Sequence, residues 1–98
     1  MRRASRQDAN HSEIASAFAR APGCRVVDVH AFAAIGCDLL VYWRGRCFHV
    51  EIKDGSKPPS ARKLTDNEED AKQRCIATGN RYRVVLSLAD VARVLRED

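Results

Sequence analysis

Residues 36–53 read GCDLLVYWRGRCFHVEIK, two apolar runs joined at Arg44-Gly45. This dipeptide is the one turn signal in the stretch, and a two-residue turn there predicts a β-hairpin in which Asp38 faces Glu51. Side chains alternate between the two faces of a strand, so this register gathers apolar residues on one face. The apolar face holds Leu39, Val41, Trp43, Phe48, Val50 and Ile52.

The opposite face of the predicted hairpin carries ionisable groups. A shift of one residue would mix the two faces, so the pattern favours this register. Directly opposed residues have Cβ atoms about 4.5–5.5 Å apart, and two carboxylates at that distance repel each other. A Mg²⁺ ion suits Asp38 and Glu51, because it takes one or two protein carboxylates and completes its shell with water and phosphate. Lys53 follows on the same face, where its ammonium can hold an attacking water or stabilise negative charge on a phosphate.

Asp38 followed by Glu51-Ile52-Lys53 resembles the signature of the PD-(D/E)xK nuclease superfamily, an acidic residue at the start of one strand and Glu-x-Lys on the next. Residues 54–68, DGSKPPSARKLTDNE, resemble the segment after this motif in small standalone phage-type members related to the VRR-NUC group. The similarity extends over residues 12–95. This chain has Cys37 where the family signature has proline, which removes no catalytic group.

The resemblance implies an α/β fold, a mixed α+β sheet with a restriction-endonuclease-like αβββαβ core. It implies a Mg²⁺-dependent DNA endonuclease, with Mn²⁺ as a substitute, acting on duplex, branched or junction DNA and working as a homodimer. Matched residue by residue, the catalytic groups are Asp38, Glu51, Lys53 and Glu68. The implied metal ligands are Asp38, Glu51, the main-chain carbonyl of Ile52, and Glu13 on the first helix.

Several of these residues also have a purely structural interpretation. Glu13 lies beside Ile14 and could reach inward, yet most helical glutamates face water. Glu68 stands three residues after Thr65, as in a capping box that starts a helix. A solvated sheet face with a Lys–Glu pair is the structural alternative for the hairpin residues. Lys57, Arg62 and Lys63 follow the second hairpin strand and form either a DNA-backbone contact or an ordinary solvated loop.

Composition agrees with these expectations without deciding between them. The chain has 98 residues, of which 45% are hydrophobic, and this predicts a single domain, residues 1–98, with a flexible basic arm at residues 1–7. A net charge of +4 favours a polyanionic partner. A non-catalytic nucleic-acid-binding domain of the same fold is therefore the alternative function. An interaction subunit ranks below it, because it does not explain why Asp38, Glu51 and Lys53 converge.

The cysteines, the histidines and the lengths of the apolar runs indicate which features we do not expect in this protein. The four cysteines form no Cys-x-x-Cys pair and have no histidine at metal-ligand spacing, so we expect free thiols, no zinc and no disulfides. His11 and His30 are expected to have no function, and His49 to be a packed residue. No apolar run is long enough for a membrane span or a signal peptide. We therefore expect a cytoplasmic protein, and the phage-type resemblance suggests a phage gene expressed in a bacterial host.

The other elements are predicted from periodicity and turn signals. We expect a first helix over residues 8–20, ended by Pro22-Gly23, and a strand over residues 25–32. A loop over residues 54–63 contains Pro58-Pro59. We expect a second helix that begins at Thr65 and runs to about Thr78, a strand over residues 82–87, and a short terminal helix over residues 90–95.

Overall fold

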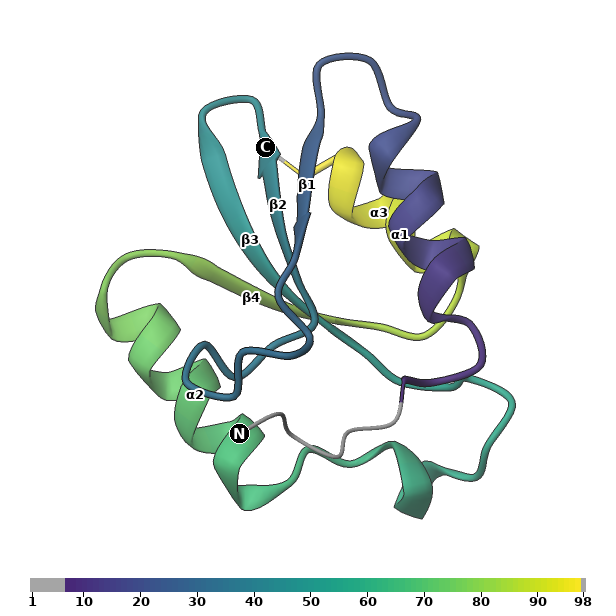
Figure 1. Ribbon diagram of the computed structural model, residues 1–98, viewed down its shortest axis with the longest axis vertical. Helices are drawn as coiled ribbons and strands as arrows, with labels where there is room; N and C mark the ends of the chain where they lie inside the picture. Colours follow the sequence, from purple (N-terminus) through teal and green to yellow (C-terminus); the bar gives the residue numbers. More distant parts are fainter. Residues whose placement is uncertain (1–6, 98) are drawn as a thin grey trace.

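The computed structural model describes residues 7–97, which form a small α+β domain with three α-helices and a four-stranded mixed sheet (Figure 1). The elements are α1 (His11–Ala19), β1 (Arg25–Asp28), β2 (Leu39–Trp43), β3 (Arg46–Ile52), the short 3₁₀ helix η1 (Pro59–Arg62), α2 (Asp66–Ala77), β4 (Arg81–Val85) and α3 (Leu88–Leu95). The predicted basic arm lies outside the described residues except for Gln7.

The hairpin formed by β2 and β3 has the predicted register. Its ladder pairs Trp43 with Arg46 and ends at Leu39 and Val50. Both turn residues have positive φ, 52° at Arg44 and 77° at Gly45, which matches the twist of the flanking strands. All five residues of the predicted apolar face other than Trp43 are fully buried, and Trp43 packs against them.

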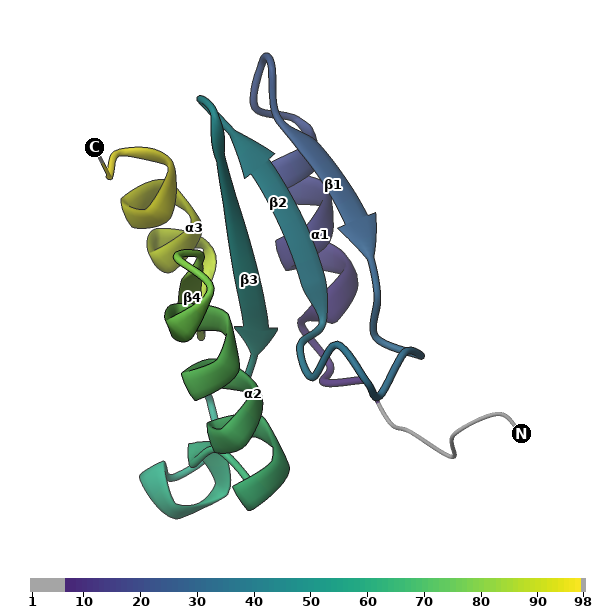
Figure 2. The ribbon, with the colours of Figure 1, turned by 90° about the vertical axis from the view of Figure 1, so that its left-hand side faces the viewer.

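The strands lie in the order β1-β2-β3-β4, antiparallel except for the parallel pair β3 and β4. Helices α1 and α3 cover the apolar face of the hairpin, and Ile14, Phe18, Val91 and Val94 complete that core. Helix α2 lies on the other face, where Cys75 packs in a second core with Tyr82 (Figure 2). The ionisable face of the hairpin therefore looks toward α2.

Strand β1 is shorter than predicted, because the chain turns directly after Asp28. The Asp28 carboxylate accepts a hydrogen bond from the backbone N–H of His30 at 3.0 Å, and Phe32 N–H donates to the Val29 carbonyl at 2.9 Å. Both contacts bend the chain away from the sheet. The predicted strand end at Phe32 was wrong, and this side chain is 61% exposed in the loop between β1 and β2.

The C-terminal elements differ from the prediction by about two residues. Strand β4 ends at Val85 because the next backbone N–H, that of Leu86, donates to the Asp90 carboxylate at 2.7 Å rather than to a neighbouring strand. This lets α3 begin at Leu88. Helix α2 was predicted correctly, with Thr65 as its N-cap and Thr78 as its C-cap.

Helix α1 starts at His11, three residues later than predicted. Its N-cap residue, Asn10, donates side-chain hydrogen bonds to the carbonyls of Lys53 and Leu86, at 3.2 and 3.1 Å. Asn10 thus ties the start of α1 to the residues that follow β3 and β4. Among residues 7–97, no helix is both long and apolar enough to cross a membrane.

Candidate functional site

A hollow of about 630 Å³ lies between the loop that precedes β2, the end of β3 and the first turns of α2. Its lining includes Cys37, Asp38, Glu51, Thr65 and Glu68. Two acidic residues predicted from the hairpin and one from the second helix therefore line the same hollow.

Asp38 lies directly before β2 and is only 7% exposed. Its backbone N–H donates to the Val50 carbonyl at 2.9 Å. One carboxylate oxygen, Oδ2, accepts a hydrogen bond from the backbone N–H of Ile52 at 2.8 Å, and the other, Oδ1, lies 2.7 Å from His30 Nδ1. These contacts hold the carboxylate in one orientation beside β3.

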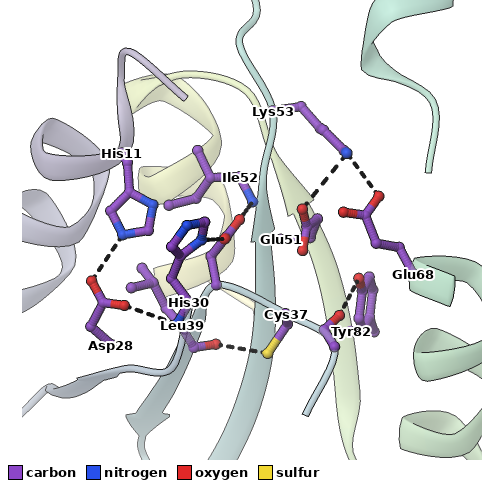
Figure 3. Close-up of polar contacts among 12 residues, drawn as sticks. His11, Asp28, His30, Cys37, Leu39, Glu51, Ile52, Lys53, Glu68 and Tyr82 are labelled. Atoms are coloured by element: carbon purple, nitrogen blue, oxygen red, sulfur yellow. Dashed lines mark hydrogen bonds and ion pairs between the residues drawn. The ribbon is translucent and has the colours of Figure 1, made fainter. Parts of the chain in front are cut away.

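Glu51, Lys53 and Glu68 form a connected polar group. Lys53 Nζ lies 2.8 Å from Glu68 Oε1 and 3.7 Å from Glu51 Oε2 (Figure 3). Glu51 is 6% exposed, and the Lys53 side chain is 13% exposed. The lysine ammonium is thus held between one carboxylate from the strand and one from α2.

The negative charges in the hollow exceed what this lysine can neutralise. Burial, the charge of Asp38 and the neighbouring Glu68 carboxyl raise the pKa of Glu51 to about 10, against the opposing effect of Lys53. In the metal-free protein Glu51 therefore holds a proton at neutral pH, even with the Lys53 ammonium 3.7 Å away. A divalent cation between Asp38 and Glu51 would favour the ionised form.

Lys53 and Glu68 are both charged at neutral pH. Burial by itself would lower the pKa of Lys53, but the hydrogen bond to Glu68 and the charges of Glu68 and Glu51 raise it. Burial by itself would raise the pKa of Glu68, but hydrogen bonds from Lys53 and from the Thr65 backbone lower it. Lys53 is therefore a cation in this site and not a general base.

Both interpretations of Glu68 from the sequence describe the same side chain. Its Oε1 accepts the Thr65 backbone N–H at 2.9 Å, and its own backbone N–H donates to Thr65 Oγ1 at 3.2 Å, which completes the capping box. The same Oε1 atom accepts the Lys53 ammonium. The cap thus fixes the carboxylate that orients Lys53.

Not every predicted site residue lies in this hollow. Glu13 is exposed on α1 and lines a separate depression of about 430 Å³ that also contains Asp54 and Arg62. The structure does not bring Glu13 together with Asp38 and Glu51, and we give it no role at their site. Ile52 ends β3 with a fully buried side chain, and metal ligation by its carbonyl stays a prediction.

The predicted DNA-contacting residues follow the site along the chain. Lys57 and Lys63 are exposed, and Arg62 is partly buried at the end of η1. The Arg62 Nε atom is buried and has no hydrogen-bond partner among the described residues. A basic segment therefore runs from the end of β3 toward the start of α2.

Cys37, which replaces the signature proline, is buried against the acidic pair. Burial and the charges of Glu51 and Asp38 raise the pKa of its thiol to about 12. The Sγ atom lies 3.4 Å from the Leu39 carbonyl oxygen and donates to it. In the metal-free protein this cysteine stays a thiol at neutral pH, which argues against a role as a nucleophile. All four cysteines are free thiols.

The sequence did not reveal the residues that surround the far side of Asp38. His30 binds its carboxylate, and His11 lies beside His30 with ring centroids 5.3 Å apart. Asp28 contacts His11 through Oδ2 at 2.9 Å from Nε2. These residues come from α1, from the end of β1 and from the loop after it, so their spacing in the sequence does not predict the contact.

Comparison with known proteins adds no relative to this description. No family model, curated protein or solved structure was found to match the chain.

Proposed function

We propose that this chain is a Mg²⁺-dependent DNA endonuclease of the PD-(D/E)xK type. The observation that carries the proposal is that Asp38, Glu51 and Glu68 line one hollow and that the Lys53 ammonium contacts both glutamates. The element order α1-β1-β2-β3-α2-β4 is that expected for a restriction-endonuclease-like core, and we propose that core for the domain. The free thiols agree with the cytoplasmic location that we propose as well.

The acidic pair fits a hard divalent cation. Both residues are buried and line the same hollow, and burial together with the charge of Asp38 raises the pKa of Glu51. Each Asp38 oxygen accepts one contact from the protein, and a carboxylate oxygen has a second lone pair to offer. Asp38 and Glu51 would hold the ion, with Mn²⁺ as a substitute for Mg²⁺. When bound, the ion supplies Lewis-acid polarisation of a phosphate and a lowered pKa for a water molecule.

Lys53 is the group in this chain that acts on the reacting phosphate. Its ammonium is charged and projects between Glu51 and Glu68, two of the residues that line the hollow (Figure 3). In that place it holds a water molecule for in-line attack and offsets the negative charge that develops on the phosphate. Glu68 positions Lys53, and the capping box of α2 positions Glu68.

The basic segment after β3 supplies the DNA contact in this proposal. Lys57, Arg62 and Lys63 bind phosphates of the backbone and read no sequence. We propose duplex or branched DNA as the substrate, and a homodimer that pairs two such sites, one for each strand.

A cleavage assay tests the proposed function. Labelled linear duplex, single-stranded and four-way-junction DNA are incubated with the protein and Mg²⁺, Mn²⁺ or a chelator. We expect metal-dependent cutting by the parent protein, a loss of at least about 100-fold in Lys53→Ala, and no loss in Arg20→Ala. Arg20 is a matched control because it is an exposed cation at the opposite end of α1 from His11.

Two results would contradict the proposal. Cutting that persists in the chelator, or at the parent rate in Lys53→Ala, would remove the site assignment. DNA binding without any cutting would favour the non-catalytic nucleic-acid-binding domain instead.

A further inference from the structure

Two histidines and two aspartates form a second polar group behind the acidic pair, which we call the histidine cluster: His11, Asp28, His30 and Asp38. His11 is the first residue of α1, Asp28 and His30 lie at and after the end of β1, and Asp38 precedes β2. The two rings are 3% and 9% exposed and meet edge to face at an interplanar angle of 70°.

Each ring has one nitrogen held by a carboxylate and one with no partner. His11 Nε2 lies 2.9 Å from Asp28 Oδ2 (Figure 3), and His30 Nδ1 lies 2.7 Å from Asp38 Oδ1. The other nitrogens, His11 Nδ1 and His30 Nε2, are buried and have no hydrogen-bond partner among the described residues. A buried polar atom left without a hydrogen-bond partner lowers the free energy of unfolding by about 1–3 kcal/mol. Two such atoms in one cluster therefore call for an explanation.

The carboxylates determine what the unpartnered nitrogens can offer. A carboxylate accepts a hydrogen bond, so in each neutral ring the proton lies on the nitrogen that faces the aspartate. The remaining nitrogen of each ring then carries a lone pair. Two lone pairs cannot satisfy each other, and none of residues 7–97 places a donor at either of them. A metal ion accepts lone pairs of this kind from two imidazole rings at once.

The potential ligand atoms of the cluster also lie close enough together to bind one metal ion. One potential ligand atom from each of His11, His30 and Asp38 lies within 4.8 Å of the other two. A histidine that binds metal through one nitrogen usually donates its other ring N–H to a carboxylate, the arrangement that Asp28 gives His11. Imidazole donors favour Zn²⁺ and related transition metals over Mg²⁺.

We propose that His11, His30 and Asp38 bind a transition-metal ion of the zinc class, with Asp28 holding the His11 ring. His11 supplies Nδ1, since its Nε2 is engaged by Asp28. The site is distinct in chemistry from the acidic pair but shares Asp38 with it. An ion at the histidine cluster therefore competes with Mg²⁺ for this carboxylate. The proposal does not depend on nuclease activity.

Zinc titration of the full-length, chelator-treated protein against a chromophoric competitor tests the proposal. We expect one equivalent of Zn²⁺ to bind, and the affinity to fall at least about tenfold in His11→Gln and in His30→Gln. Asp28→Asn should weaken binding about tenfold by releasing the His11 ring. His49→Gln is the matched control, because His49 is a half-buried histidine on β3 outside the cluster, and its affinity should not change.

Two further measurements keep the result independent of folding defects in the variants. In the parent protein, Zn²⁺ should shift the ring ¹⁵N resonances of His11 and His30 and leave those of His49 in place; the same spectra identify the nitrogen that His30 supplies. Co²⁺ in place of Zn²⁺ should show visible d–d absorption without a thiolate charge-transfer band. Absence of Zn²⁺ binding, unchanged affinity in both well-folded histidine variants, or a thiolate band would overturn the proposal.

Discussion

Glu51 is the residue at which stability and the proposed function conflict. Its carboxyl is buried beside Asp38, and burial together with that charge raises its pKa to about 10. The usual pKa of a glutamate is 4.5. A group with a raised pKa in the folded state stabilises the fold below its unfolded pKa and loses that contribution as the pH rises toward its folded pKa. In the metal-free protein, Glu51 should therefore make the free energy of unfolding fall as the pH rises from about 4.5 to about 10.

Glu51→Gln should make the metal-free protein more stable at pH 8. Glutamine keeps the shape of the side chain and removes the charge, so we expect a gain of about 1–2 kcal/mol at pH 8 that shrinks toward pH 5. Urea unfolding at both pH values, with a chelator present, measures the difference. Glu69→Gln, at an exposed site on α2, should show no such pH dependence. A variant less stable than the parent at pH 8 would contradict this reading of Glu51.

Mg²⁺ should stabilise the parent protein through the same residue. An ion that binds only the folded state at ten times its Kd adds about 1.4 kcal/mol to the free energy of unfolding. We expect this gain in the parent and little of it in Asp38→Asn or Glu51→Gln. Thermal unfolding with and without Mg²⁺ provides the measurement. An equal gain in all three proteins would place the ion elsewhere.

At the residue scale, the sequence predicted which hairpin side chains share a face, but not all their neighbours. Alternation of apolar and ionisable residues is enough to place Glu51 and Lys53 on one face. The capping box fixes the Glu68 side chain locally, but its contact with Lys53 depends on how α2 packs against the sheet. The surroundings of Asp38 depend on how the loop after β1 folds, because His30 reaches it from there. Glu13 was misplaced because a helical residue's orientation depends on how α1 packs, which the sequence does not state.

At the scale of elements, Gly36 determines how closely α2 approaches the site. It has a φ of 77°, and a Cβ atom there would lie 2.3 Å from the Cβ of Ala71 on α2. Its carbonyl also accepts the Tyr82 hydroxyl at 3.3 Å. Glycine is therefore required both by the backbone conformation and by the contact with α2.

Gly36→Ala should lower the free energy of unfolding by about 2–4 kcal/mol. This loss combines the strain of a left-handed backbone conformation with overpacking against α2. Gly23→Ala is the matched control: Gly23 has a φ of 85°, but nothing lies within 4 Å of an added Cβ, so only the strain of about 1–2 kcal/mol applies. Chemical denaturation of both variants isolates the contact with α2. If both variants lost the same free energy of unfolding, the contact between residue 36 and α2 would not limit how closely α2 packs.

Element boundaries were predictable where local chemistry decides them. The Thr65–Glu68 capping box is a local device, and α2 begins where it predicts. The ends of β1 and β4 depend on side chains that capture a backbone N–H, Asp28 at His30 and Asp90 at Leu86. A run of valines does not reveal such competition, so both strands were predicted too long.

For the whole molecule, the net charge of +4 leads to a prediction about salt. Each phosphate contact that a cation makes contributes about 0.9 to the slope of log affinity against log salt concentration for duplex DNA. The combined variant Lys57→Ala, Lys63→Ala should bind duplex DNA more weakly and lower this slope by about 2. Fluorescence anisotropy over a salt series, with a chelator present, measures it.

The control for the salt series is Arg20→Ala, which removes one exposed cation from the far end of α1. Its slope should equal that of the parent. If the lysine variant also keeps the parent slope, DNA does not lie along the segment after β3.

The order of elements across the whole chain was predictable because each one has its own local signal. Turn residues, apolar periodicity and the capping box together predicted a helix, three strands, a helix, a strand and a final helix, and the described residues follow that order. The histidine cluster was not predictable, because it forms only where α1, the loop after β1 and the start of β2 meet.

The most direct test of the central claim is the rate of Mg²⁺-dependent DNA cleavage by the parent protein and by Glu51→Gln, measured alongside their stability. We predict that the cleavage rate of Glu51→Gln is at least about 100-fold lower than that of the parent. We also predict that its free energy of unfolding at pH 8 is larger than that of the metal-free parent. A loss of activity in a more stable protein cannot come from misfolding. Cleavage by Glu51→Gln at the parent rate, or cleavage by the parent that needs no divalent ion, would contradict the assignment of this site.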